Sequence, residues 1–180
     1  MKKTVSVLMM FIAGLTMTFT SCSSSSTSEV PTATFTSLSV KYSLNTTGDF
    51  LKLFDVTVQY KDASGITQTE TVTTNDYSKT VTVSSLPYTS GVKFTIKMKD
   101  GVDQTKTYSY SRSFTTAYNP TYSDGSVSIL KNSSVSETLS GVRYERLNAE
   151  ITSMNKVYNE AYTFSLSDSK IVQTSTSVNL

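Results

Sequence analysis

The feature that most constrains the fold is an alternation of apolar and polar side chains between residues 35 and 114. In the first run, Leu38, Val40 and Tyr42 alternate with serine and lysine. The same two-residue period recurs in four later runs, at residues 54–60, 81–83, 92–98 and 108–114. Successive side chains of a β-strand point to opposite faces, so each run places one face in a core and the other in water. The pattern predicts half-buried antiparallel strands.

Short turn segments separate these runs. The strongest hairpin signals are DASG at residues 62–65 and DG at residues 100–101, because aspartate and glycine suit tight turns. Short strands that recur at roughly ten-residue spacing are typical of two packed antiparallel sheets. We therefore expect a mainly β protein with a sandwich architecture.

One loop resembles part of a known family. Residues 85–89 (SLPYT), followed by the run at 92–98, resemble the loop of leucine, proline and threonine that enters the sixth strand of fibronectin type III and immunoglobulin-like domains. Those domains usually place a corner tyrosine at the start of that strand, where this chain has Val92. The resemblance implies an immunoglobulin/fibronectin type III-like antiparallel sandwich over residues 33–117.

The period changes after this region. Residues 117–134 show no sustained alternation and are interpreted as a loop with a short strand at 126–130. Farther along, five residues spaced three and four apart define one helical face: Tyr144, Leu147, Ile151, Met154 and Tyr158. We expect a C-terminal extension over residues 118–180 that contains one amphipathic helix at about 141–160.

The N-terminus predicts export. Lys2 and Lys3 precede an apolar stretch over residues 5–19, which is shorter than the roughly twenty residues that a membrane-spanning helix needs. Small residues then lead to Cys22, the only cysteine. Residues 19–22 (FTSC) resemble the looser lipoboxes of bacterial, Bacteroidota-type lipoproteins. This resemblance implies a signal peptide over residues 1–21 and lipidation of the Cys22 sulfur, the alternative being an ordinary secretory signal with a chance cysteine.

Residues 22–32 predict a flexible tether, since they are polar and rich in serine. The lipoprotein resemblance implies stable anchoring through several acyl chains. Ser23 rather than aspartate follows the cysteine, which by the same resemblance favours the outer membrane. Whether the domain faces the periplasm or the cell surface stays open.

Charge and residue usage weigh against several function classes. Lys2 and Lys3 leave with the signal segment, so 14 basic residues remain against 14 acidic ones, without a basic cluster. Nucleic-acid binding needs clustered lysine and arginine, so no nucleic-acid partner is expected. Histidine is absent, and a lipidated Cys22 is no nucleophile. We expect no enzyme and no cofactor, with a glycosidase carboxylate pair as a remote alternative.

Oxygen ligands for a metal occur only beside predicted turns. Asp100 and Asp103, and likewise Asn75 and Asp76, offer hard ligands of the kind that Ca²⁺ prefers. Aspartate is equally favoured in turns for its local hydrogen bonds to the backbone. The turn interpretation is the stronger one, so no metal site is expected.

Tyrosines near the end of the last run are the candidate binding site. Tyrosine combines an apolar face with a polar tip, as a glycan or protein contact requires. The candidate ligand-binding residues are Tyr110, Arg112, Tyr118 and Tyr122. The alternative is that Tyr108 and Tyr110 point inward from a strand while the others cover one end of the sandwich.

The sequence therefore predicts a lipid-anchored protein of the cell envelope, attached to the membrane through Cys22. Its leading function is a non-catalytic binding or accessory module for a glycan or a protein partner. The alternative is a structural envelope component, acting as a spacer or assembly subunit.

Overall fold

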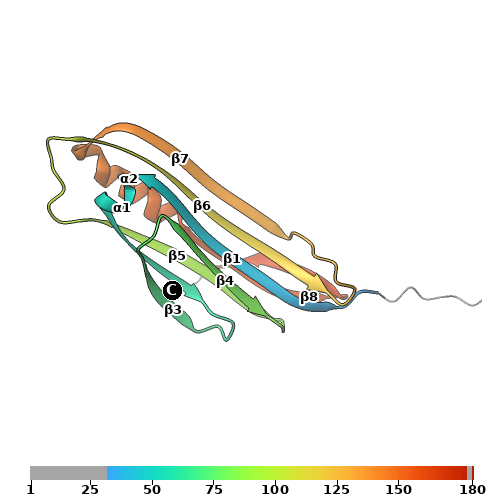
Figure 1. Cartoon of the computed structure of the whole chain (residues 1–180). Coiled ribbons are helices and arrows are strands. Elements are labelled where there is room, and N and C mark those ends of the chain that lie inside the picture. Colours follow the sequence, from blue (N-terminus) through green and yellow to red (C-terminus); the bar gives the residue numbers. More distant parts are fainter. Residues whose placement is uncertain (1–31, 178–179) are drawn as a thin grey trace, which may run out of the picture. The chain divides into compact units, whose positions relative to one another are not determined.

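The computed structural model describes residues 32–177 and Leu180 (Figure 1). The predicted signal peptide, Cys22 and nearly all of the predicted tether lie outside these residues. The described chain contains two helices and nine strands, in the order β1 (Phe35–Gly48), α1 (Phe50–Leu53), β2 (Phe54–Lys61), β3 (Thr67–Val72), β4 (Asp76–Val83), β5 (Tyr88–Met98), β6 (Thr107–Tyr122), β7 (Lys131–Arg143), α2 (Tyr144–Val157), β8 (Asn159–Ser167) and β9 (Lys170–Ser175).

The strands form two antiparallel sheets, which confirms the mainly β, sandwich-like prediction. Sheet A has the order β4-β1-β6-β7, and sheet B has the order β3-β2-β5-β8-β9. Within sheet A, Val40 pairs with Val81 of β4 on one side and with Tyr118 of β6 on the other. Within sheet B, β5 is central and pairs with both β2 and β8.

The core lies between the two sheets and is held by aromatic pairs. Phe114 of β6 and Phe94 of β5 meet with ring centroids 5.3 Å apart, and Tyr110 of β6 meets Phe54 of β2 at 5.6 Å. The apolar members of the first predicted run are fully buried, as the alternation requires. Edge-to-face rings of this kind add a favourable electrostatic contact to the burial of apolar area.

One of the two predicted hairpins is confirmed and the other is wrong. Residues 62–65 form the turn that connects β2 to β3. The Asp62 carboxylate accepts hydrogen bonds from the backbone N–H groups of Ser64 and Ile66. Residues 100–101 do form a turn, but β5 and β6 belong to different sheets. The connection from residue 99 to 106 is long enough to cross between sheets, so the local Asp-Gly signal does not set the pairing.

The predicted boundary between residues 117 and 118 is also wrong. It falls inside β6, which continues to Tyr122. Beyond it, β7 extends sheet A while β8 and β9 extend sheet B. Residues 118–180 therefore belong to the same compact unit as residues 32–117. The alternating pattern did not predict that β6 continues to Tyr122, because Thr116 and Pro120 occupy inward positions where a typical apolar strand residue was expected.

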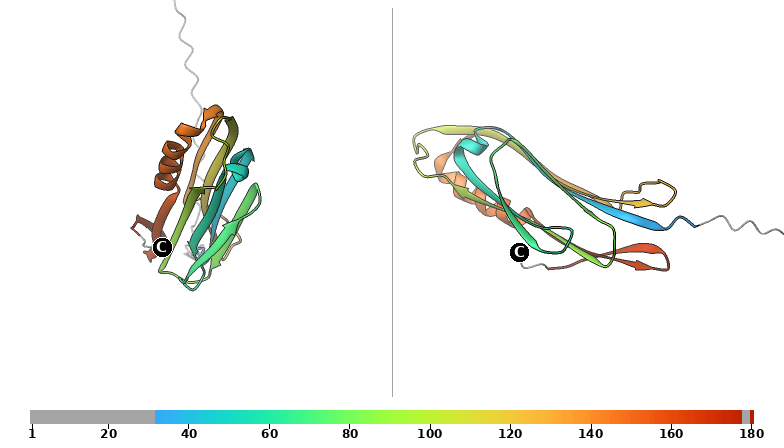
Figure 2. Two further views of the ribbon diagram at one scale, coloured as in Figure 1. Left: turned by 90° about the vertical axis from the view of Figure 1, so that its left-hand side faces the viewer. Right: turned by 60° about the horizontal axis from the view of Figure 1, so that its bottom comes forward.

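The predicted helix is present as α2, shorter at both ends than expected. Leu147, Met154 and Tyr158 of the predicted face are fully buried, and Tyr144 and Ile151 pack against the core. Figure 2 shows α2 beside the strands. Within the described residues, neither helix is both long and apolar enough to cross a membrane.

A side-chain amide joins α2 to the edge of a strand. β8 pairs with β5 only as far as Lys93. From there, Asn155 of α2 takes the place of a neighbouring strand: its Oδ1 accepts the Ile96 N–H at 2.7 Å, and its Nδ2 donates to the Ile96 carbonyl at 3.1 Å. The helix thereby satisfies backbone groups that would otherwise be buried without partners.

Candidate functional site

Three of the four predicted ligand-binding residues lie in the core. Tyr110, Arg112 and Tyr118 occupy alternate positions of β6 and point into the interior, where Arg112 is 4% exposed and Tyr118 is 0% exposed. The prediction that they form a surface patch is therefore wrong. All four candidates have even residue numbers, so a regular strand places them on one face, and that face is the core. Only Tyr122, at the end of β6, is partly accessible.

Tyr118 packs as a core residue. Its ring lies 5.1 Å from that of Phe164 and 5.5 Å from that of Tyr162, both on β8. Burial raises the pKa of the Tyr118 hydroxyl well above its usual value. Burial likewise raises the pKa of Tyr110 to about 12. Both phenols are therefore neutral near pH 7, and neither is available to a ligand in solution.

Arg112 forms ion pairs inside the protein. Its Nη2 contacts Glu137 of β7 and lies 3.5 Å from Glu150 of α2. A guanidinium buried to this degree needs paired carboxylates to offset its lost hydration. Arg112 therefore links α2 to sheet A, which is a structural role.

A second, largely buried charge, Glu160 of β8, has its own partners. Thr116 and Ser133 donate their hydroxyls to Glu160 Oε2 at 3.0 and 3.1 Å, and the Lys131 ammonium lies 3.4 Å from Oε1. Lys131 also lies over the ring of Tyr162, 3.9 Å from its centroid. These groups join β6 and β7 of sheet A to β8 of sheet B.

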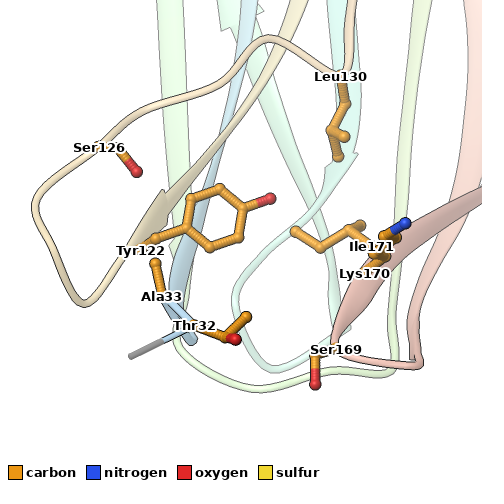
Figure 3. Close-up of a pocket in the computed structure, with 8 residues that line it drawn as sticks. All are labelled: Thr32, Ala33, Tyr122, Ser126, Leu130, Ser169, Lys170 and Ile171. Carbon is orange, nitrogen blue, oxygen red and sulfur yellow. The ribbon is translucent and has the colours of Figure 1, made fainter. Parts of the chain in front are cut away.

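One accessible concave site is a groove at one end of the sandwich, which we name the terminal groove. It has a volume of about 410 Å³. The segment before β1, the end of β6, the β6–β7 loop, the β8–β9 turn and the start of β9 contribute its lining residues, which are Thr32, Ala33, Tyr122, Ser126, Leu130, Ser169, Lys170 and Ile171 (Figure 3). Tyr122, Leu130 and Ile171 give it a mainly apolar wall.

The β6–β7 loop is folded back onto β6 rather than forming the predicted strand at 126–130. Ser128 donates its N–H to the Pro120 carbonyl at 3.1 Å, and Leu130 donates to the Tyr118 carbonyl at 3.0 Å. Pairing is limited to one isolated bridge, between Thr121 and Val127. The loop is therefore held in place by backbone hydrogen bonds.

Exposed apolar side chains occur on two of the segments that form the terminal groove. Val127 and Ile129 of the β6–β7 loop are 63% and 73% exposed, and Leu166 and Val172 of the β8–β9 hairpin are also exposed. Strand register places Leu166 beside Ile171 on the inner face of sheet B, whereas Val172 lies on the outer face of that sheet. Val127 pairs with Thr121 and therefore lies, with Ile129, on the outer face of sheet A. Only Leu166 among these four residues therefore extends the apolar wall of the groove. Sequence reasoning missed this site, because the segments that line it are far apart along the chain.

Charge around the groove is mixed. Lys170 is part of its wall, while Asp124 and Asp168 lie in the adjoining turns. Ser126 donates its hydroxyl and its N–H to Asp124, which lowers the pKa of that carboxyl. Asp124 is therefore ionised near neutral pH and committed to its own turn. The site offers apolar contact area rather than acid–base chemistry.

Asp103, one of the aspartates considered as metal ligands, has structural partners. Asp103 accepts hydrogen bonds from the N–H and the hydroxyl of Thr105, and it lies 3.3 Å from Lys106. In the part of the chain that the structure describes, no three His, Cys, Asp or Glu side chains are grouped as a metal site would require.

No family model matches the chain, and neither the curated proteins nor the solved structures contain a significant match.

Proposed function

We propose that the protein is a lipid-anchored component of a bacterial cell envelope, held at the outer membrane through Cys22. It acts as a non-catalytic binding or accessory module. The lipobox-like FTSC segment supports the anchor, and the two-sheet fold is compatible with the fibronectin type III or immunoglobulin-like family that the SLPYT loop resembles. Such sandwiches present loops and strand ends as contact surfaces.

The terminal groove is the observation that carries the binding role. Its wall combines the apolar faces of Leu130 and Ile171 with Tyr122, which brings both a ring and a hydroxyl. Leu166, which pairs with Ile171, extends this apolar surface along the β8–β9 hairpin. The contact made here is with another component of the envelope. The proposed site does not include Tyr110, Arg112 and Tyr118, because these side chains are buried in the core.

The proposal includes no catalytic role. Buried Arg112 and largely buried Glu160 are engaged in ion pairs and hydrogen bonds that join the two sheets and α2. None of the described residues that line the groove is a carboxylate, whereas hydrolysis of a glycan usually uses two of them.

The experiment that tests the anchor compares the wild type with Cys22→Ala in a Bacteroidota host. We expect the wild type to fractionate with the outer membrane and to incorporate radiolabelled palmitate, and Cys22→Ala to do neither. Protease added to intact cells then separates the two orientations, because only a surface-exposed domain is digested before the outer membrane is breached. Equal membrane association of both chains would overturn the lipid-anchored proposal.

A further inference from the structure

Sheet A has one face in the core and one face in solvent. The solvent face carries the odd-numbered residues 37–47 of β1 and 111–121 of β6, and the even-numbered residues 76–82 of β4 and 132–138 of β7. These side chains are exposed or partly exposed, except that of Ser43, which is 9% exposed. Figure 1 shows the four strands side by side. We name this surface the hydroxyl face, because most of its residues are serine or threonine.

The hydroxyl face is nearly uncharged. Lys41 and Asp76 are its charged residues, although it extends over four strands. In sheet B, by contrast, β2 and β5 alone place Asp55, Lys93 and Lys97 on their solvent face. Charged side chains keep an exposed sheet soluble and discourage pairing at its edges. The low charge of the hydroxyl face is therefore a property that distinguishes it within the molecule.

The hydroxyls of this face form a regular array. Neighbouring strands lie about 4.8 Å apart, and every second side chain along a strand follows the last at about 6.8 Å. The hydroxyls of Ser113 and Ser136 are 2.7 Å apart, and those of Thr115 and Ser134 are 3.4 Å apart. A hydroxyl has one donor and two acceptor lone pairs, so each of these four retains capacity for a further partner.

A small apolar area adjoins the array. Val127 pairs with Thr121, and the backbone hydrogen bonds between the β6–β7 loop and β6 place Ile129 beside Asn119. Val127 and Ile129 are therefore exposed on the same side of sheet A as the hydroxyl face. The surface combines many hydroxyls with two apolar side chains.

We infer that the hydroxyl face binds an extended, uncharged polysaccharide. A sugar polymer offers hydroxyls that donate and accept along its whole length, and C–H groups that can pack on Val127 and Ile129. Residues 111–121 of β6 span about 33 Å at 3.3 Å per residue, so a polymer can contact many side chains at once. The inference goes beyond the proposed function, because it concerns a surface other than the terminal groove and does not depend on lipidation of Cys22.

Other classes of partner fit the hydroxyl face less well. Protein–protein contacts are enriched in aromatic residues, methionine and arginine and depleted in serine, whereas the hydroxyl face has none of the enriched types. Nucleic acids and anionic lipids are held by clustered basic residues, and Lys41 is the single basic residue of this face. A neutral polymer rich in hydroxyls matches both the low charge and the hydrogen-bonding groups.

The same chemistry predicts how binding should behave. A hydrogen bond to a sugar replaces one to water, so each contributes little by itself. Affinity should therefore rise with the length of the polymer. Because few charges take part, affinity should respond little to ionic strength.

The test is biolayer interferometry of the mature chain, with Cys22→Ser in place of the acylated N-terminus. The sensors carry dextran, mannan, galactan or hydroxyethyl cellulose, all of which are neutral. We expect binding to at least one of these polymers, equal at low and high salt, and weaker binding to its short oligosaccharides. Carboxymethyl cellulose, which is negatively charged, should not bind.

Two double variants that add the same charge make the result specific. Ser113→Glu with Thr115→Glu, at the centre of the hydroxyl face, should weaken binding at least tenfold, because carboxylates lose hydration against a neutral polymer. The control, Thr57→Glu with Gln59→Glu, changes two partly exposed positions on the solvent face of β2 and should bind as the wild type does. Ser136→Glu, on the edge strand β7, should weaken binding about threefold with the least risk to folding. Circular dichroism melting checks that each variant folds.

Four results would overturn the inference: no binding to any neutral polymer, equal loss in the double variant and its control, loss of binding in Tyr122→Ala, or a wild-type dimer that Ser113→Glu with Thr115→Glu abolishes. Sedimentation velocity detects the dimer. The third result would assign the sugar to the terminal groove, and the fourth would assign the hydroxyl face to a second copy of the chain. The palmitate experiment tests the anchor separately, so failure of either proposal leaves the other standing.

Discussion

Glu70 of β3 and Lys79 of β4 form an ion pair, 2.6 Å from oxygen to nitrogen, that connects an edge strand of one sheet to an edge strand of the other. The Tyr60 and Tyr77 hydroxyls donate to the same carboxylate at 2.6 and 3.0 Å. Lys79 also lies 5.0 Å from the centroid of the Tyr60 ring. One carboxylate thus joins β2 and β3 to β4 along this side of the sandwich.

Glu70→Gln should lower the free energy of unfolding by about 1 kcal/mol. The substitution removes the charge that Lys79 contacts and weakens two charge-assisted hydrogen bonds, but the side chains are more than a third exposed, so solvent screens the interaction. Urea unfolding gives the value. The control is Glu145→Gln on the exposed side of α2, and an equal loss in both variants would show that Glu70 does not join the sheets.

The same contact should depend on pH. Hydrogen bonding from Lys79, reinforced by that from Tyr60, lowers the pKa of Glu70 below its ordinary value of 4.5. The unfolded chain therefore takes up this proton first as the pH falls, so the stabilisation is complete above about pH 4.5 and is lost below it. Other carboxylates titrate in this range, so the quantity to measure is the stability difference between wild type and Glu70→Gln. It should shrink between pH 5 and pH 3, and a constant difference would contradict the assignment.

The sheets were predictable where the alternating side chains were apolar. The alternation at Leu38, Val40 and Tyr42 predicted β1 correctly, because apolar side chains at every second position indicate a strand with one face in the core. The inner face of β6 contains Arg112 and Thr116, and most of β7 is polar and exposed at the sheet edge. Hydropathy carries no signal for such strands, since their place is set by tertiary pairing.

The candidate site was less predictable than the fold. Tyrosine suits both a core and a binding surface, so residue type alone could not separate Tyr118 from Tyr122. The stronger indication was that both residues have even numbers on one strand, so they share the face that carries the other buried candidates. The terminal groove combines segments near residues 32, 122, 130 and 170, which only the folded chain brings together.

Arg112→Met should destabilise the protein by about 3 kcal/mol. The methionine fills much of the arginine volume, yet it leaves Glu150, which is only slightly exposed, beside an apolar side chain without its counter-charge. Chemical denaturation measures the loss. Arg146→Met, an exposed position on α2, serves as the control and should change little. If both variants were equally stable, the buried ion pairs would not be what holds α2 against sheet A.

Replacing Tyr118 should cost far more stability than replacing Tyr122. Tyr118→Ala removes a fully buried ring and should cost about 3–5 kcal/mol. Tyr118→Phe should be neutral or slightly stabilising, because the Tyr118 hydroxyl is buried without a hydrogen-bond partner among the described residues. Tyr122→Ala, at the groove, should shift the melting temperature far less. A folded, stable Tyr118→Ala chain would return Tyr118 to the list of ligand-binding candidates.

Asn155→Leu should weaken the contact between α2 and β5. Leucine has similar size but cannot pair with the Ile96 backbone, so one N–H and one carbonyl lose their partners at a partly buried position. Each unsatisfied group costs about 1–3 kcal/mol, and we expect a loss of about 2 kcal/mol in the free energy of unfolding. Native-state hydrogen exchange should become faster at the Ile96 amide. Asn148→Leu on the exposed face of α2 is the matched control, since it alters the same residue type without touching β5. Unchanged protection of Ile96 in Asn155→Leu would show that β5 does not need the helix amide to hold its edge.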